Sequence, residues 1–153
     1  MDVSNIHTIS EIQEAIVAEL GKNTYFIEHD VPILYENSKT IDFDIKSSIG
    51  KIGTVVTVTT PSMTFAGKYG TTNTPPFWTM ETATVVVAEN PVLNRSRANY
   101  STALDTALQI AQTLNRIPHM GLTSIDQTSE AGLVLVTVTF KTNIAFCYEV
   151  EEK

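Results

Sequence analysis

The sequence predicts a single α+β domain, in which a mostly antiparallel β-sheet carries two α-helices on one face. The length of 153 residues is typical of one domain. Two segments show the apolar spacing of amphipathic helices, and several others alternate apolar and polar residues as half-buried strands do. The elements follow the order α-β-β-β-β-α-β-β, which favours an antiparallel sheet with the helices packed against it.

The first helix is predicted from Thr8 to Leu20. Apolar residues recur there at spacings of three and four, so one face of the helix is lined by Ile9, Ile12, Ile16 and Leu20. Two capping-box pairs compete for its start, namely Thr8 with Glu11 and Ser10 with Gln13. Gly21 supplies the left-handed conformation at which such a helix ends.

Four strands are predicted between the helices. Residues 31–35 are short and apolar, and their proline places them at the start or edge of a sheet. Residues 41–46 and 54–60 alternate on either side of a turn with two glycines, so 40–60 is predicted as an antiparallel hairpin. The strand 78–89 has no consistently apolar face before residues 85–87. We expect its first half to be exposed or to extend beyond the sheet, and its second half to lie in the core.

The segment 61–77 interrupts the strands as a loop or arm within the domain. It contains five prolines and glycines together with the aromatic residues Phe65, Tyr69 and Phe77. Long loops in compact domains are often functional or disordered, and a plain solvated loop would carry fewer aromatic residues. Two interpretations stay open: an ordered arm that contacts a partner, and a surface loop that packs on its own domain.

The second helix is predicted from Asn99 or Ser101 to Arg116, with Ser101 or Ser96 as its N-cap. Its buried stripe is predicted to consist of Ala103, Leu104, Ala107, Leu108, Ala111 and Leu114. Pro118 then prevents the helix from continuing. The chain closes with a second hairpin, in which strands 122–125 and 133–146 flank a turn at 126–132.

Charge and cysteine content narrow the classes of function. The net charge of −7 argues against nucleic-acid binding as the main role, because affinity for phosphates comes from clustered Lys and Arg. Cys147 is the one cysteine, so no intramolecular disulfide can form, and we expect it to be a small buried hydrophobe. The first residues lack the apolar stretch of a signal peptide, and no apolar run is long enough to cross a bilayer. We therefore expect a soluble chain made in the cytoplasm.

No catalytic pattern stands out. The sequence contains no phosphate-binding loop, dinucleotide fingerprint, nucleophile elbow or zincin motif. His7, His29 and His119 are separated along the chain, and the acids beside His29 are explained by chance. Asp42 and Asp44 share one face of a predicted strand, where a solvated surface accounts for them. We expect no catalytic residue, no metal site and no cofactor.

The segment 89–95 links the long strand to the second helix with two Asn, one Pro and one Arg. These are turn and capping residues in their own right. The other interpretation is a contact in which Arg95 or Arg97 meets an acidic patch on a neighbouring subunit. Together with the aromatic segment, this gives a predicted interface of Phe65, Tyr69, Phe77, Trp78, Arg95 and Arg97.

This layout resembles the tail-terminator, or tail-completion, proteins of long-tailed bacteriophages. The resemblance covers most of the chain as an order of elements: the helix 8–20, the strands through Pro32, 54–60 and 78–89, the helix 101–114, and the hairpin 122–146. No residue motif anchors it. It implies a virion protein of the tail or neck that forms a homo-oligomeric ring, such as a hexamer, and contacts other tail or neck proteins, with segment 61–77 as an inserted arm.

In such a ring, surplus acidic residues would line a channel that DNA crosses without specific binding. One alternative is another head–tail or baseplate adaptor. A second, of a different class, is a small-molecule-binding module or enzyme with a pocket between sheet and helices. Polar groups that converge in a deep pocket would favour the second alternative, whereas a broad interface with an extended arm would favour the ring.

Overall fold

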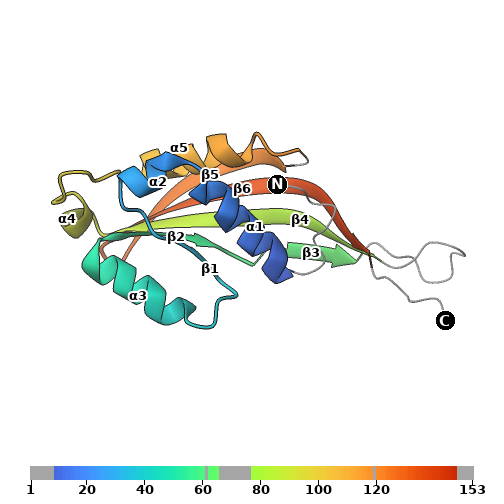
Figure 1. The fold of residues 1–153 in the computed structure, drawn as a ribbon, viewed down its shortest axis with the longest axis horizontal. Helices are drawn as coiled ribbons and strands as arrows, with labels where there is room; N and C mark the ends of the chain where they lie inside the picture. The colour runs from blue at the N-terminus through green and yellow to red at the C-terminus, as the bar shows by residue number, and fades with distance from the viewer. Residues whose placement is uncertain (1–8, 61, 66–76, 119, 148–153) are drawn as a thin grey trace, which may run out of the picture.

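The computed structural model describes residues 9–60, 62–65, 77–118 and 120–147. Figure 1 shows α1 and α5 lying over a twisted sheet whose strands run on past both helices at one end. In chain order the elements are α1 (Ile9–Gly21), α2 (Thr24–Glu28), β1 (Ile33–Tyr35), α3 (Ile41–Lys51), β2 (Thr54–Val58), β3 (Ser62–Phe65), β4 (Phe77–Glu89), α4 (Pro91–Asn94), α5 (Ala103–Leu114), β5 (Met120–Glu130) and β6 (Leu133–Cys147).

The six strands form one mixed sheet. Its order is β1-β2-β4-β6-β5, and β3 pairs with β4 outside this path. Among the described strands, β1 and β2 are parallel, while β2–β4, β3–β4, β4–β6 and β5–β6 are antiparallel. The predicted α+β class is confirmed. The finer prediction of two helices is wrong for the described part of the chain, which contains five.

The core lies between one face of the sheet and the helices α1 and α5. Cross-strand register stacks Val56, Val87 and Val136 in one row and Val58, Val85 and Val138 in the next. All six are buried in the same cluster as Ile12 and Ile16 of α1 and Ala107 and Ile110 of α5. Each large apolar side chain removed from water in this way stabilises the fold by roughly 1.5–3 kcal/mol. Alanines on α5 let that helix approach the sheet closely.

Residues 41–51 form a helix, α3, where the sequence predicted a strand. Ile41, Phe43 and Ile45 do alternate, but over a longer stretch the apolar spacing at 41, 45, 49 and 52 is helical. Phe43 lies off this stripe and is 73% exposed. The helix connects the parallel strands β1 and β2, as a crossover between parallel strands requires. The predicted hairpin at 40–60 is therefore wrong.

Asp42 and Asp44 consequently lie in the first turn of α3 rather than on a strand face. Carboxylates are stabilised there by the positive end of the helix dipole. Asp44 also accepts a hydrogen bond of 2.6 Å from the hydroxyl of Thr40. Local helix chemistry thus accounts for both acids.

Several other boundaries differ from the predictions. The helix α2 was missed, and the connector after the long strand contains the short helix α4. The N-cap of α5 is Thr102, whose hydroxyl accepts from the backbone N–H of Asp105. Leu104 and Leu108, predicted in the buried stripe, are 51% and 49% exposed.

The closing hairpin has a shorter turn than predicted. Strand β5 continues to Glu130, so the turn consists of Ala131 and Gly132 rather than residues 126–132. Their φ angles are +51° and +80°. Two consecutive residues with positive φ are the mark of a tight two-residue hairpin turn, whose twist matches that of its strands.

The long strand β4 confirms its prediction within one residue, and Val85 and Val87 lie in the core as expected. The segment 61–77 is not wholly a loop, because residues 62–65 form β3 and pair antiparallel with β4. Residues 66–76, including Tyr69, lie outside the described residues, as do Thr8, His7 and His119.

Gly53 fixes the junction between α3 and β2. Its φ is +87°, and a Cβ built on it would lie 2.5 Å from the backbone nitrogen of Asn94. Its carbonyl accepts a hydrogen bond of 2.8 Å from the backbone N–H of Asn90. Only glycine combines this conformation with so close an approach between two chain segments.

We predict that Gly53→Ala lowers the free energy of unfolding by about 2–3 kcal/mol, through strain and the clash with Asn94. The measurement is urea-induced unfolding followed by circular dichroism. Gly50→Ala is the matched control. It lies in the exposed interior of α3 with nothing within 4 Å of the added Cβ, and it should be neutral or stabilising by about 0.5–1 kcal/mol. Equal stability of the two variants would contradict this description of the junction.

Candidate functional site

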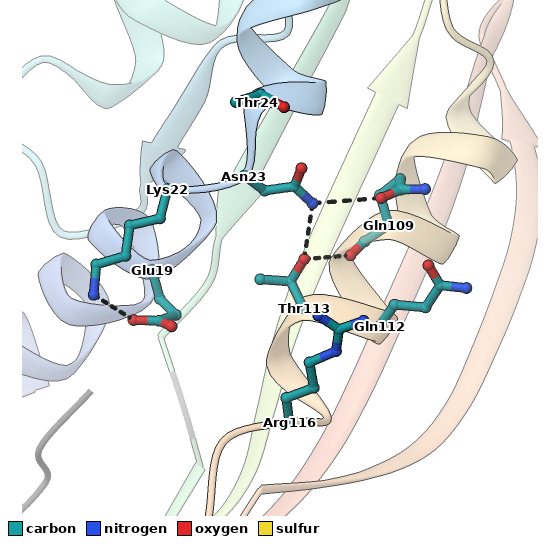
Figure 2. Close-up of a pocket in the computed structure, with 8 residues that line it drawn as sticks. All are labelled: Glu19, Lys22, Asn23, Thr24, Gln109, Gln112, Thr113 and Arg116. Atoms are coloured by element: carbon teal, nitrogen blue, oxygen red, sulfur yellow. Dashed lines mark hydrogen bonds and ion pairs between the residues drawn. The ribbon is translucent and has the colours of Figure 1, made fainter.

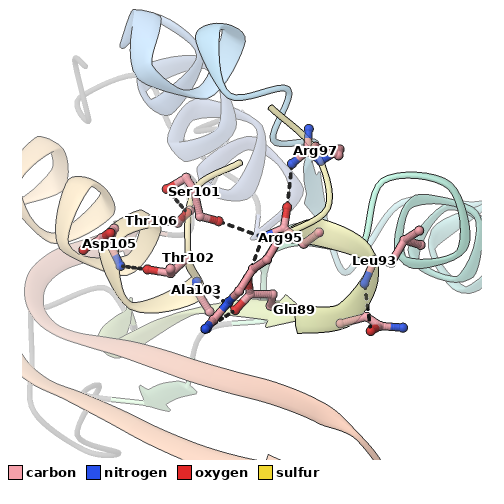
Figure 3. Close-up of polar contacts among 11 residues, drawn as sticks. Glu89, Leu93, Arg95, Arg97, Ser101, Thr102, Ala103, Asp105 and Thr106 are labelled. Atoms are coloured by element: carbon pink, nitrogen blue, oxygen red, sulfur yellow. Dashed lines mark hydrogen bonds and ion pairs between the residues drawn. The ribbon is translucent and has the colours of Figure 1, made fainter. Parts of the chain in front are cut away.

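A buried carboxylate organises the chain segment between β4 and α5. Glu89, the last residue of β4, is 0% exposed and shares the strand face of Val85 and Val87. Its carboxylate receives four hydrogen bonds from three residues (Figure 3). Arg95 donates through Nε at 3.3 Å and through a terminal nitrogen at 3.2 Å, and Asn94 donates through Nδ2 at 2.5 Å. The fourth donor is the backbone N–H of Ala103, at 3.2 Å.

Each of these contacts has a clear electrostatic reason. Ala103 is the first residue of α5, so the carboxylate lies at the positive end of that helix dipole. The Arg95 guanidinium meets both carboxylate oxygens, and this two-point geometry is the strongest form of such a pair. In turn, the Glu89 carboxylate raises the pKa of Arg95 above its usual value. A buried charge needs this degree of pairing to be tolerated.

The network continues from Asn94 toward α2. Asn94 is fully buried and donates to the backbone carbonyl of Ser101 at 2.9 Å, while its oxygen accepts from Arg97 at 2.6 Å. Arg97 also donates to the backbone carbonyl of His29 at 3.1 Å. Ser101 is hydrogen-bonded to the hydroxyls of Tyr25 and Thr106. The segment 89–101 is thus tied to the sheet, to α5 and to α2.

His29 belongs to this junction rather than to a solvated strand. It is the C-cap of α2, its ring is tilted against Tyr25 with centroids 4.4 Å apart, and its Nδ1 is 2.8 Å from the backbone oxygen of Asn99. Asn99 in turn donates to the carboxylate of Asp30 at 2.8 Å. The acids beside His29 are therefore part of a junction between α2 and the segment before α5.

The predicted interface residues fall at opposite ends of the long strand. Arg95 and Arg97 lie beyond the end of β4 that carries Glu89, and both bind groups of their own chain. Phe77 and Trp78 begin the same strand, which at 13 residues is about 40 Å long. Phe65 pairs with Trp78 through the backbone of β3 and β4. One chain does not bring the arginines and aromatic residues together, and their contact with a neighbour stays a prediction.

Glu89 itself was not predicted as a site residue, although the sequence contained a signal for it. Period-two alternation places Glu89 on the same strand face as Val85 and Val87, so a buried strand end implies a buried carboxylate. Such a group requires donors nearby. Asn94 and Arg95 follow it within six residues.

A polar groove of about 490 Å³ lies between the end of α1 and the side of α5 (Figure 2). Its walls meet where Asn23 donates to Thr113 at 3.0 Å and to Gln109 at 3.4 Å. Lys22 lies at its rim, 3.1 Å from Glu19, and lowers the pKa of that carboxyl. The groove offers amide and cationic donors to a polar ligand.

Two other cavities, each of about 400 Å³, open on the surface. One is lined mainly by apolar residues of α1, α2 and β1, and the other by Tyr25, His29, Tyr100, Ser101 and nearby residues of α5. In the described residues, no group of three or more His, Cys, Asp or Glu is arranged to hold a metal ion. No helix in that part of the chain is long and apolar enough to span a membrane.

No protein-family model matches the chain, and no curated protein matches it either.

We predict that Glu89→Gln lowers the free energy of unfolding by about 2–4 kcal/mol. In glutamine an NH2 group replaces one carboxylate oxygen. Its N–H groups would face the donors of Asn94, Arg95 or Ala103, so buried donors on both sides would lack acceptors. Chemical denaturation measures the effect. Glu130→Gln, at the exposed end of β5, is the matched control and should change stability by less than about 0.5 kcal/mol. A loss in the Glu89 variant no larger than the control's would refute the role of the carboxylate.

Proposed function

We propose that this chain is a structural protein of a long-tailed phage virion, acting as a ring-forming tail-terminator or neck subunit rather than as an enzyme. Its partners would be further copies of itself and other tail or neck proteins. The observation that supports this proposal best is the ribbon formed by β3, β4 and β6 at the end of the sheet away from Glu89.

The ribbon runs on past the helices that cover the rest of the sheet (Figure 1). There the first residues of β4 pair with β3 on one side and with Ile144–Cys147 of β6 on the other. The sequence of these strands is almost uncharged and includes Phe65, Phe77 and Trp78. We propose that a neighbouring copy covers this ribbon, because uncharged sequence with aromatic residues is typical of protein interfaces.

The body of the molecule also exposes apolar side chains at several places. Ile27, Phe43 and Val92 are each at least 70% exposed, and they belong to α2, α3 and α4. Single exposed apolar residues are common on monomers, but one on each of three helices provides several separate points for subunit contact. A subunit inside a ring has neighbours on two sides and further proteins above and below, which fits several contact surfaces.

The acidic balance fits a channel that DNA must pass through. With a net charge of −7 per chain, a closed ring would repel phosphates rather than hold them. DNA could then cross the ring without specific binding. Localisation in the virion, after synthesis in the host cytoplasm, follows from this proposal.

A small-molecule-binding module is the alternative from a different class, and the polar groove beside α5 is the observation that favours it. Lys22, Asn23, Gln112 and Arg116 converge there from two elements. The groove lies between helices at the surface rather than between sheet and helices. Among its lining residues no nucleophile is paired with a base, so the groove offers binding rather than catalysis.

We predict that the chain forms a closed homo-oligomer, detected by native mass spectrometry, and that the segment 66–76 contributes to it. Replacing 66–76 by a short Gly-Ser link would join β3 directly to β4 as a hairpin. We expect this variant to keep its thermal stability and to assemble only at concentrations at least tenfold higher, because Tyr69 and its neighbours are removed.

The control is Ala131→Asn, at the other end of the sheet, which gives the turn the sequence Asn-Gly that suits its conformation. It should fold and assemble normally. A chain that stays monomeric at high concentration, without binding other virion proteins, would rule out the ring subunit. Normal assembly of the 66–76 variant would remove that segment from the interface.

A further inference from the structure

We propose that the outer edge of β5, together with the leucines on the adjacent side of α5, binds strand β3 of a second copy of this chain. This inference rests on the proposed ring assembly and names the surface that would build it. The second copy would add its strand to the sheet by backbone hydrogen bonds and cover the leucines with its side chains.

Within the described residues, β5 is a long strand whose outer edge pairs with no other strand. It spans 11 residues, pairs with β6 on one side, and ends the strand order of the sheet. From Ser124 to Glu130 its register with β6 is regular, so the outer backbone groups form an even row. Natural proteins protect such edges with proline, charged side chains, bulges or short strands. β5 has no proline or lysine and its bulge lies before Ser124, so its two acids, Asp126 and Glu130, are the protection along the regular stretch. On the opposite side of the sheet, β1 has three residues and β3 has four.

The side of α5 toward β5 is apolar and exposed. Leu104 and Leu108 are one helical turn apart and about half exposed. Asn115 lies on the same side of the helix, and its side-chain oxygen accepts a hydrogen bond of 3.2 Å from the backbone N–H of Leu122 in β5. The opposite side of α5 carries Gln109 and Thr113, which contact Asn23 after α1. By helical spacing, Leu104 and Leu108 lie on the Asn115 side of α5, toward β5, and Leu108 also lines the surface cavity beside Tyr25 and His29.

Leu122 extends this surface onto the strand. It pairs with the core residue Phe140, so it lies on the helix-covered face of the sheet, yet it is 41% exposed. A strand added outside β5 would place alternate side chains on that same face, over Leu122 and beside Leu104 and Leu108. We call these three residues with the β5 edge the leucine edge.

Charge excludes the pairing of one β5 edge with another. The β5 edge carries Asp126 and Glu130 and no basic residue, so pairing of β5 with another β5 would bring four carboxylates together. Within the described chain, β1 and β3 are both uncharged and pair on one side only. We assign β3, with the sequence Ser-Met-Thr-Phe, because it belongs to the ribbon that runs on past the helices. A contact between two different surfaces can also be repeated from copy to copy, as a ring requires. A twofold dimer instead uses the same surface on both copies.

The first test compares assembly of Leu104→Glu/Leu108→Glu with that of Ala18→Glu/Gln112→Glu. Both double variants place two carboxylates at exposed helix positions, but only the first pair lies at the leucine edge. We expect the first to raise the concentration for half-assembly at least tenfold in native mass spectrometry, and the second to match the wild type. Thr128→Lys, on the other face of β5, should also weaken assembly, because it places a lysine on the edge strand. This second variant keeps the test valid if the leucine variant does not fold.

Assembly of the leucine-edge variants at wild-type concentrations would overturn the inference while leaving the ring proposal intact. A wild-type chain that stays monomeric would instead refute both.

The second test identifies the strand that binds. In a Cys147→Ser background, chains with Gln127→Cys in β5 are mixed with chains carrying Met63→Cys in β3 and are oxidised. A disulfide-linked pair that needs both variants is the expected result. Disulfides between two Gln127→Cys chains would show that β5 pairs with itself, and the assignment of β3 would then be wrong. Absence of either product from assembled protein would likewise reject the edge as the interface.

Discussion

The carboxylate of Glu89 is the constraint on which the arrangement of this fold depends. It ends the central strand β4 inside the protein, where a charge is tolerated only with full pairing. Its partners are the backbone at the start of α5 and the side chains of Asn94 and Arg95. The requirement to pair one buried charge therefore fixes both the path of segment 89–101 and the position at which α5 begins over the sheet.

The position of α5 has consequences for the surface. Because Glu89 fixes its first turn and Asn115 contacts Leu122 near its end, α5 is fixed at both ends relative to the sheet. One side of the helix packs toward α1, and the other is left along the open edge of β5. The same constraint that stabilises the fold thus leaves Leu104 and Leu108 exposed on the side of α5 toward the outer edge of β5. In the ring that we propose, the ribbon at the far end of β4 would supply the second surface that a repeating contact needs.

The sequence predicted those elements whose signals are local. The helix α1 and the strand β4 follow from apolar spacing, and the buried half of β4 follows from Val85 and Val87. The strand predicted at 41–46 failed because Ile41 and Ile45 fit both periods and Phe43 fits the period of two, so only Ile49 and Ile52 indicate the helix. Leu104 and Leu108 fit a buried stripe by spacing, but nothing local shows that β5 ends the sheet and leaves them uncovered.

The candidate site depended still more on tertiary structure. The turn residues of segment 89–95 were recognised, and Arg95 was singled out, but its partner was sought on another subunit. The partner is Glu89, six residues earlier, and the buried environment that makes the pair important comes from Asn94, Ser101 and the start of α5. Likewise, the acids beside His29 were attributed to chance, because the contact between His29 and Asn99 joins positions 70 residues apart and leaves no local signal in the sequence.

Electron microscopy of the purified wild-type chain tests the central claim of a ring-forming subunit most directly. The account predicts closed particles with rotational symmetry and a central opening, in which the sheet edges of adjacent copies meet. Class averages that show only single copies, twofold dimers or open filaments would contradict it.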